Sequence, residues 1–250
     1  MSTLLPLLAG YVRYCPGGSL HFTAYSPKLV QVWHFGKFAA AKECVTRILS
    51  LPNVGWDMET EEAPMRKVIA SEIVSLDGVV ESPQKWHFPY FNDQMAEAIG
   101  AAMAASDAML LGRVTYEEFA AFWPSQEGSD EDQETTDYMN NTTKYIVSKT
   151  LEEPLAWNNS TLIKGDVAEE ITRLKQQPGK DISITGSPTL VRSLLEDDLL
   201  DELRLMVHPI VVGSGKRLFE DGSDQKALQL VDSKTFCTGV LYLTYQPAQS

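Results

Sequence analysis

From residue 65 onward, apolar runs of strand length alternate with helical segments, and this alternation limits the possible folds more than any other feature of the chain. The first five strand-like runs, with helical segments between several of them, lie at 68–74, 108–112, 144–148, 160–163 and 181–185. Three more, which follow one another directly, lie at 202–212, 227–232 and 239–246. This order predicts an α/β fold with a mixed, mostly parallel sheet flanked by helices and with antiparallel strands at its C-terminal end.

Helix starts are predicted from capping signals. Three segments with helical spacing follow good N-cap residues: 93–105 after Asn92, 167–176 after Asp166 and 188–196 after Ser187. A further helix is expected to open at Thr115, which forms a T-x-x-E capping box with Glu118. The acidic segment 125–137 is expected to be a long solvated loop.

The composition changes near Pro64. Residues 1–64 carry equal numbers of basic and acidic side chains, so the formal net charge of −13 belongs to residues 65–250. The first part shows little periodicity apart from a possible helix at 38–49, and the stretch WDMETEEAP (56–64) is typical of a linker. We expect residues 1–64 to be a poorly packed extension, with Met65 as the natural start, or alternatively a small functional module. Residues 65–250 are expected to form one compact domain.

Charge and residue counts exclude several kinds of function. The net charge of −13 argues against nucleic acid or an anionic membrane as the main partner. No apolar run approaches the length of a membrane span, which needs about 18 residues or more. Three cysteines without paired spacing and four scattered histidines favour a cytoplasmic protein without a metal site.

A charged residue directly follows a buried-strand pattern in the stretch MLLGRVTYEEF (109–119). In open α/β sheets, ligands bind where strands end and helices begin. Arg113 would lie near a helix N-terminus, where the helix dipole disfavours a cation. An anion held by the guanidinium and the helix N–H groups would remove this conflict. The alternative is a solvated surface arginine.

Two loops that contain glycine are further candidates. In ITGSPTLVRSLLE (184–196) a strand passes through Gly186 into a helix whose free N–H groups can hold phosphate, although an ordinary capped turn is the alternative. The stretch VGSGKRLF (212–219) lacks the spacing of a P-loop. Lys216 or Arg217 would still be able to contact a phosphate there, but a simple turn is the favoured interpretation.

The stretch SLDGVVESPQKWHFPYFND (75–93) combines a carboxylate with aromatic side chains. Asp77 and Gly78 are consistent with a simple turn. The aromatic cluster fits either core packing or a flat wall for a ligand ring. Because a carboxyl group beside aromatic rings often has a raised pKa, such a group can act as an acid.

The order of these motifs is similar to that of the dihydrofolate reductase superfamily, in particular its riboflavin-biosynthesis reductase C-terminal domain branch. VSLDGVV resembles the branch's SLDG, LLGRVTYE resembles GRxTxE, and ITGSPTLVRSLL resembles GGxxLxxxLL. DDLLDELRLMVHPIVVGSGKRLF resembles the run LVDEL…P…GxGxxLF. The resemblance covers about residues 65–247. It implies a three-layer dihydrofolate reductase-like fold and a homodimer formed through the C-terminal strands.

The resemblance implies an NADPH-dependent reductase that transfers a hydride to a small heterocyclic or carbonyl substrate. The reductase of 5-amino-6-(5-phosphoribosylamino)uracil in riboflavin biosynthesis is the named example. A pterin, folate or quinone reductase and a non-catalytic nucleotide-binding protein are the alternatives. Residues 1–64 lack the H-x-E and C-x-x-C zinc signature of the deaminase partner domain, so the chain resembles the stand-alone relatives.

The resemblance also implies the site residues. Those implied for the cofactor are Gly112, Arg113, Thr115, Val147, Ser148, Lys149, Gly186, Ser187, Thr189 and Leu190. Those implied for the substrate are Trp86, Phe88, Gly213 and Gly215. Phe91 occupies the place of the dihydrofolate reductase carboxylate, which argues against reduction of dihydrofolate itself. Because the SLDG aspartate faces the substrate side in the riboflavin branch, the resemblance implies Asp77 as the first candidate for the proton donor and Asp93 as the second.

Overall fold

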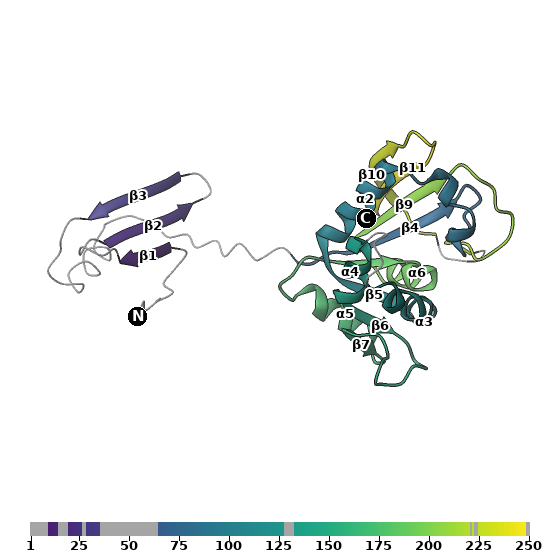
Figure 1. Cartoon of the computed structure of the whole chain (residues 1–250), viewed down its shortest axis with the longest axis horizontal. Coiled ribbons are helices and arrows are strands. Elements are labelled where there is room, and N and C mark those ends of the chain that lie inside the picture. Colours follow the sequence, from purple (N-terminus) through teal and green to yellow (C-terminus); the bar gives the residue numbers. More distant parts are fainter. Residues whose placement is uncertain are drawn as a thin grey trace. The chain divides into compact units, whose positions relative to one another are not determined.

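The computed structural model describes residues 10–14, 20–26, 29–35, 65–127, 133–220, 222 and 225–248. The chain divides into two compact units, residues 1–60 and 61–250 (Figure 1). In the first unit, an antiparallel sheet of order β1-β2-β3 is formed by β1 (Gly10–Tyr14), β2 (Leu20–Ser26) and β3 (Leu29–Phe35). The sequence pattern of residues 1–64 did not predict these strands. The helix predicted at 38–49 and the linker at 56–64 lie outside the described residues.

The second unit is built around an eight-stranded sheet of order β10-β11-β9-β4-β8-β5-β6-β7. Its strands are β4 (Val68–Ser75), β5 (Ser106–Gly112), β6 (Thr143–Val147), β7 (Ser160–Ile163), β8 (Asp181–Thr185), β9 (Glu202–His208), β10 (Leu228–Thr235) and β11 (Leu241–Pro247). All neighbours from β9 to β7 are parallel, whereas β11 runs antiparallel to both β9 and β10. The predicted mixed sheet with antiparallel C-terminal strands is confirmed.

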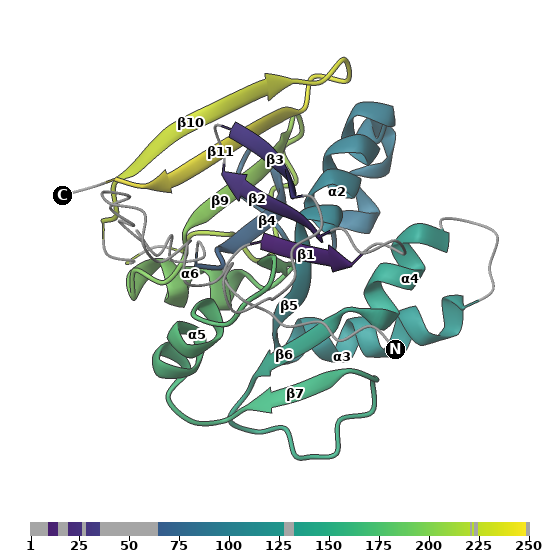
Figure 2. The ribbon, with the colours of Figure 1, turned by 90° about the vertical axis from the view of Figure 1, so that its left-hand side faces the viewer.

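Helices cover both faces of this sheet. The α-helices are α2 (Asp93–Ala105), α3 (Arg113–Phe122), α4 (Gln133–Asn141), α5 (Val167–Lys175) and α6 (Pro188–Glu196). Short 3-10 helices are η1 (Pro83–Lys85), η2 (Phe88–Tyr90) and η3 (Trp123–Gln126). Figure 2 shows α5 and α6 on one side of the sheet and α2 and α4 on the other. The second unit therefore has the three layers that the family resemblance implied.

Side chains along β4 alternate between the two outer layers. Val68, Ala70 and Val74 belong to the core cluster that includes buried residues of α5 and α6. On the opposite face, Met206 of β9 packs in a separate cluster with Met95 of α2. Because successive strand residues point to opposite faces, every second residue of β4 points toward α6.

Two of the predicted N-caps are confirmed. The side chain of Asn92 accepts a hydrogen bond from the N–H of Met95 at 3.0 Å, and Asp166 accepts one from Glu169 at 3.1 Å. The capping box predicted at Thr115 is wrong. Helix α3 begins two residues earlier, and the Thr115 hydroxyl bonds to a different turn.

Two predicted boundaries also differ. The segment 125–137 was expected to be a loop because it is acidic, but α4 starts at Gln133. One side of this helix is buried and includes Met139. The strand expected over 202–212 ends at His208, because Pro209 has no N–H to donate to a strand ladder.

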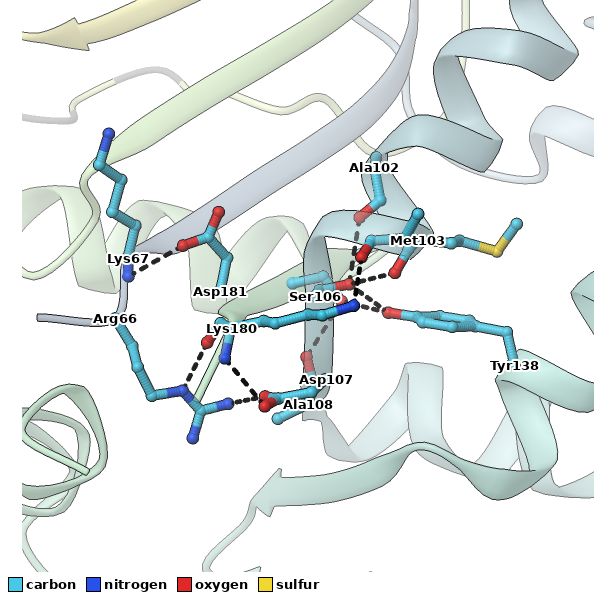
Figure 3. A network of polar contacts seen from close by, with 12 residues as sticks. Arg66, Lys67, Ala102, Met103, Ser106, Asp107, Ala108, Tyr138, Lys180 and Asp181 are labelled. Atoms are coloured by element: carbon cyan, nitrogen blue, oxygen red, sulfur yellow. Dashed lines mark hydrogen bonds and ion pairs between the residues drawn. The ribbon is translucent and has the colours of Figure 1, made fainter. Parts of the chain in front are cut away.

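A polar network joins the amino ends of β4, β5 and β8 (Figure 3). The buried guanidinium of Arg66 forms an ion pair with Asp107 and donates a hydrogen bond to the Lys180 carbonyl at 2.6 Å. Asp107 also accepts a hydrogen bond from the N–H of Lys180 at 2.9 Å. Nearby, the hydroxyls of Ser106 and Tyr138 lie 2.6 Å apart. Ligands of open parallel sheets bind at the carboxyl ends, so this network has a structural role and the opposite edge holds the candidate site.

Candidate functional site

The carboxyl ends of neighbouring parallel strands bring the predicted cofactor residues to one edge of the sheet. The strands concerned lie in the order β4-β8-β5-β6. Gly112 at the end of β5 pairs with Val147 at the end of β6. Helix α3 begins directly after β5, and α6 begins after β8. The motifs LLGRVTYE, KYIVS and ITGSPT, which are far apart in the sequence, thus meet at this edge.

Three hydrogen bonds join the start of α3 to the turn before α6. The hydroxyl of Thr115 donates to the Gly186 carbonyl at 2.5 Å, and the hydroxyl of Ser187 donates to Thr115 Oγ1 at 2.9 Å. The N–H of Gly112 donates to Ser187 Oγ at 3.0 Å. Both hydroxyl residues are buried. They therefore fasten the two helix starts to each other, and the Ser187 side chain does not cap α6.

Gly186 is the residue that allows this close approach. Its φ is +66°, a left-handed conformation that glycine adopts without steric penalty. A Cβ at this position would lie 3.4 Å from Thr115 Cγ2. A larger residue would strain the turn and push α3 away from it.

Two exposed cations lie where β5 and β6 end. Arg113 is the first residue of α3, and its Nη1 donates to Glu117 Oε2 at 2.8 Å. Lys149 is exposed just beyond β6. Beside it, the Ser148 hydroxyl is buried and accepts hydrogen bonds from the N–H groups of Thr150 and Leu151, both at 3.1 Å. The edge therefore presents two positive side chains next to a helix N-terminus, an arrangement suited to an anion.

The carboxylate of Asp77 holds the loop that follows β9. It accepts hydrogen bonds from the N–H groups of Val212 at 3.0 Å and Gly213 at 2.8 Å, and from the Ser75 hydroxyl at 2.7 Å. These contacts, the Ser75 hydroxyl first, lower the pKa of Asp77 to about 2. The group is thus ionised at neutral pH and has no proton to donate. The raised pKa expected beside aromatic rings does not occur here.

Two further contacts hold the same loop. The carboxylate of Glu81 accepts a hydrogen bond from the N–H of Lys216 at 2.9 Å, and a Cβ on Gly215 would lie 3.0 Å from that carboxylate. Arg192 of α6 donates to the carbonyls of Arg217 and Leu218 at 3.2 Å and 3.0 Å. The stretch VGSGKRLF is therefore attached to the SLDG segment and to α6.

The aromatic stretch before α2 is divided between core and surface. Trp86 is buried, its indole N–H donates to the Glu81 carbonyl at 3.2 Å, and its ring lies edge-on to His208 at 5.4 Å. Burial lowers the pKa of both His87 and His208, so these rings are neutral at pH 7. Phe88 is 62% exposed. Of the two side chains predicted for the substrate, Phe88 is the one with a face available to a ligand.

Asp93, the second carboxylate predicted as a proton donor, is the first residue of α2 and is exposed. Within the described ranges, no group of three His, Cys, Asp or Glu side chains is placed to hold a metal ion. None of the helices described in the structure is long and apolar enough to cross a membrane.

Glu72, whose carboxyl group is buried in the middle of β4, was not among the residues predicted for the site. Its side chain shares the α6 face with Ala70 and Val74, and the residue is 3% exposed. Burial raises the pKa of Glu72 to about 8, although backbone hydrogen bonds from Ser187 and Gly186 act in the opposite direction. The sequence does contain an indication of this burial. Glu72 lies in the apolar run VIASEIV and alternates with Val68, Ala70 and Val74, which point to the core.

Comparison with known proteins identifies the family of this chain. The family model of the RibD C-terminal domain matches residues 66–242. The uncharacterized protein YyaP of Bacillus subtilis is 30% identical over 196 residues, which cover 74% of this chain and 97% of YyaP.

Two solved structures have a similar fold. One is a putative riboflavin biosynthesis protein from Shewanella sp. PV-4, with a TM-score of 0.59, 21% identity and coverage of 73% of this chain and 99% of that chain. The other is a pyrimidine reductase-like protein from Corynebacterium diphtheriae, with a TM-score of 0.54, 15% identity and coverage of 74% and 93%. The family match confirms what the order of the motifs predicted: the chain belongs to the RibD C-terminal domain family.

Proposed function

We propose that this protein is an NADPH-dependent reductase that transfers a hydride to a small heterocyclic or carbonyl substrate. The observation that carries the proposal is the hydrogen-bonded junction of Gly112, Thr115 and Ser187, with the exposed Arg113 beside it. The junction joins two helix starts at the carboxyl edge of the sheet, where open α/β folds bind dinucleotides. The 5-amino-6-(5-phosphoribosylamino)uracil reductase is the named activity that this family membership favours.

The anionic groups of the cofactor would meet different parts of this edge. Arg113 and Lys149 would contact the 2′-phosphate, and Gly112, Val147 and Ser148 would line the adenosine. The pyrophosphate would lie on the N–H groups of Thr189 and Leu190, which the geometry of a helix start leaves unpaired. When bound, NADPH supplies the hydride, and the chain supplies position and charge.

The accompanying proton needs a source other than Asp77, whose carboxylate is ionised and holds the loop after β9. We assign it to water or to Asp93, which is exposed at the start of α2. Phe88 would form one wall for a planar substrate, and Gly213 and Gly215 would line the loop beside it.

A second copy of the chain would extend the sheet. β10 is an edge strand, and Leu230 and Val231 are exposed on it, as is Leu241 on the neighbouring β11. Exposed apolar edge strands are prone to pairing with another chain. We include a homodimer formed through these strands in the proposal.

The test of the proposed activity is NADPH oxidation by the full chain with separate candidate substrates, followed by product analysis. We expect oxidation with 5-amino-6-(5-phosphoribosylamino)uracil and a product reduced at the ribosyl group. Faster oxidation with dihydrofolate, a pterin or a quinone would support those reductase classes instead. NADPH binding without turnover on any of them would contradict an enzyme and support a nucleotide-binding protein.

A further inference from the structure

We propose that Glu72 is a positioning residue for the cofactor turn. Its buried carboxyl group holds the backbone of Gly186 and Ser187 from beneath, and loss of its proton weakens the binding of an anionic dinucleotide at the start of α6. The inference rests on the proposed function, because NADPH is the dinucleotide concerned. Glu72 acts through the turn and has no assigned contact with the reacting atoms.

The position of Glu72 follows from the register of the sheet. Ser71 of β4 pairs with Thr185, the last residue of β8, so the next residue of each strand lies just beyond this pair. Glu72 points to the α6 side, and Gly186 begins the turn that leads into α6. The backbone N–H groups of Ser187 and Gly186 lie close enough to the carboxyl group to lower its pKa, which agrees with this position beside the turn.

The carboxyl group is only partly satisfied. The residue is 3% exposed, and its Oε1 atom has no hydrogen-bond partner among the described residues. An unpartnered buried oxygen beneath a helix start is a second observation, independent of the helix itself. It places a buried group that can gain or lose a charge directly behind the turn.

The surroundings of Glu72 contain no compensating cation in the described part of the chain. On its face of the sheet, the flanking side chains are Ile182 and Ile184 of β8 and Leu203 and Leu205 of β9. The charged residues of the neighbouring elements are Asp181 on β8, Glu202 and Arg204 on β9, Arg192 and Glu196 on α6, and Arg113, Glu117 and Glu118 on α3. None of these groups contributes to the raised pKa of Glu72.

Strand alternation and existing contacts explain this isolation. Asp181, Glu202 and Arg204 are out of phase with the apolar residues that face Glu72, so they point to the opposite side of the sheet. Arg192 is engaged with the loop carbonyls and with Glu220. Deprotonation of Glu72 therefore places an unneutralised negative charge behind the turn.

A negative charge on Glu72, behind the turn before α6, would weaken the binding of a phosphate group at the start of that helix. In the protonated state, the carboxyl group is neutral and leaves the positive end of α6 available to an anion. In the ionised state, the carboxylate and the pyrophosphate repel each other through an interior that screens weakly. By linkage, NADPH binding must also raise the proton affinity of Glu72.

The experiment measures the dissociation constant of NADPH for the full chain at about pH 7 and about pH 9.5 by nicotinamide fluorescence. We expect the wild type to bind about fivefold or more weakly at the higher pH. The reason is that Glu72 takes up a proton when NADPH binds. The affinity for NADPH therefore falls by up to about tenfold per pH unit at pH values between the pKa of Glu72 in the free protein and its higher pKa in the NADPH complex. Glu72→Gln keeps an acceptor oxygen but cannot ionise, so its affinity should change less than about twofold. The control Glu196→Gln removes an exposed carboxylate from α6 and should retain the wild-type decrease.

Equal wild-type affinity at the two pH values, or the same decrease in Glu72→Gln, would overturn the inference and leave the proposed function intact. Absence of NADPH binding at about pH 7 would overturn both. If Glu72→Gln fails to fold, calorimetry of the wild type at about pH 8.5 in two buffers of different ionisation enthalpy decides the matter. Uptake of a fraction of a proton on binding supports the inference, and no uptake contradicts it.

Discussion

Glu72→Gln is expected to make the protein more stable, and the gain should grow as the pH rises. In the folded state, the pKa of Glu72 is raised to about 8 by burial, against an ordinary value of 4.5. Between these two values the unfolded chain releases the proton and the folded chain retains it. The stability of the wild type therefore falls across this window by about 1.4 kcal/mol per pH unit. The glutamine variant has no such proton and does not show this loss.

The gain should be small near pH 4.5 and reach roughly 2–4 kcal/mol near pH 7.5, after allowance for the amide that replaces the carboxyl group. Denaturant unfolding of both proteins at several pH values measures the difference directly. Glu196→Gln, in which an exposed carboxylate is removed, should stay within about 0.5 kcal/mol of the wild type. A glutamine variant that is less stable at every pH, or a difference independent of pH, would contradict the account of Glu72.

Lys144→Met is expected to have the opposite effect. Lys144 is fully buried, and its ammonium donates to the carbonyls of Thr142, Asn140 and Asn158 at 2.8, 3.1 and 3.4 Å. It also lies 4.2 Å from the centre of the Trp157 ring. Burial lowers the pKa of Lys144 to about 8, so the group is still charged at pH 7. Unlike Glu72, this buried ionisable group has its hydrogen bonds satisfied.

Removing the ammonium leaves three carbonyl groups without that donor while the methionine keeps most of the apolar packing. We expect a loss of roughly 2–4 kcal/mol, since a hydrogen bond to a charged group contributes about 1.5–3 kcal/mol. Thermal or denaturant unfolding at pH 7 measures it. Lys164→Met, at a surface ion pair with Glu152, should change stability by less than about 1 kcal/mol. Equal effects of the two variants would show that the contacts of Lys144 contribute little.

Local patterns were enough to predict much of the fold. The strand alternation indicated the mixed sheet, and the Asn92 and Asp166 caps were predicted from residues within one helical turn. The errors arose where distant contacts decide the outcome. Thr115 has the spacing of a capping box, but its hydroxyl bonds to Gly186, which is brought beside it only by the folded sheet. The segment 125–137 is rich in acidic residues and was therefore expected to be a loop, although one side of α4 is buried.

The candidate site was predicted only in part. The motifs placed Arg113 and Gly186 at strand ends, where the structure has them. They did not show that Asp77 is held by backbone N–H groups of a loop far along the chain. They also did not show that Glu72 lies beneath the turn before α6. In both cases the pKa depends on burial and hydrogen bonds between segments, which a sequence pattern does not contain.

The central claim is that Arg113 and the turn before α6 form an NADPH site. The most direct test is a paired titration of the full chain with NADPH and NADH, with Arg113→Ala and Glu117→Gln alongside. We predict micromolar NADPH binding and much weaker NADH binding by the wild type. Arg113→Ala should lose roughly 10- to 150-fold in NADPH affinity and with it the preference over NADH. Glu117→Gln, which removes the partner of Arg113 but keeps the guanidinium, should bind NADPH at least as tightly as the wild type. Equal affinity of the wild type for the two cofactors, or an unchanged NADPH preference in Arg113→Ala, would contradict the assignment.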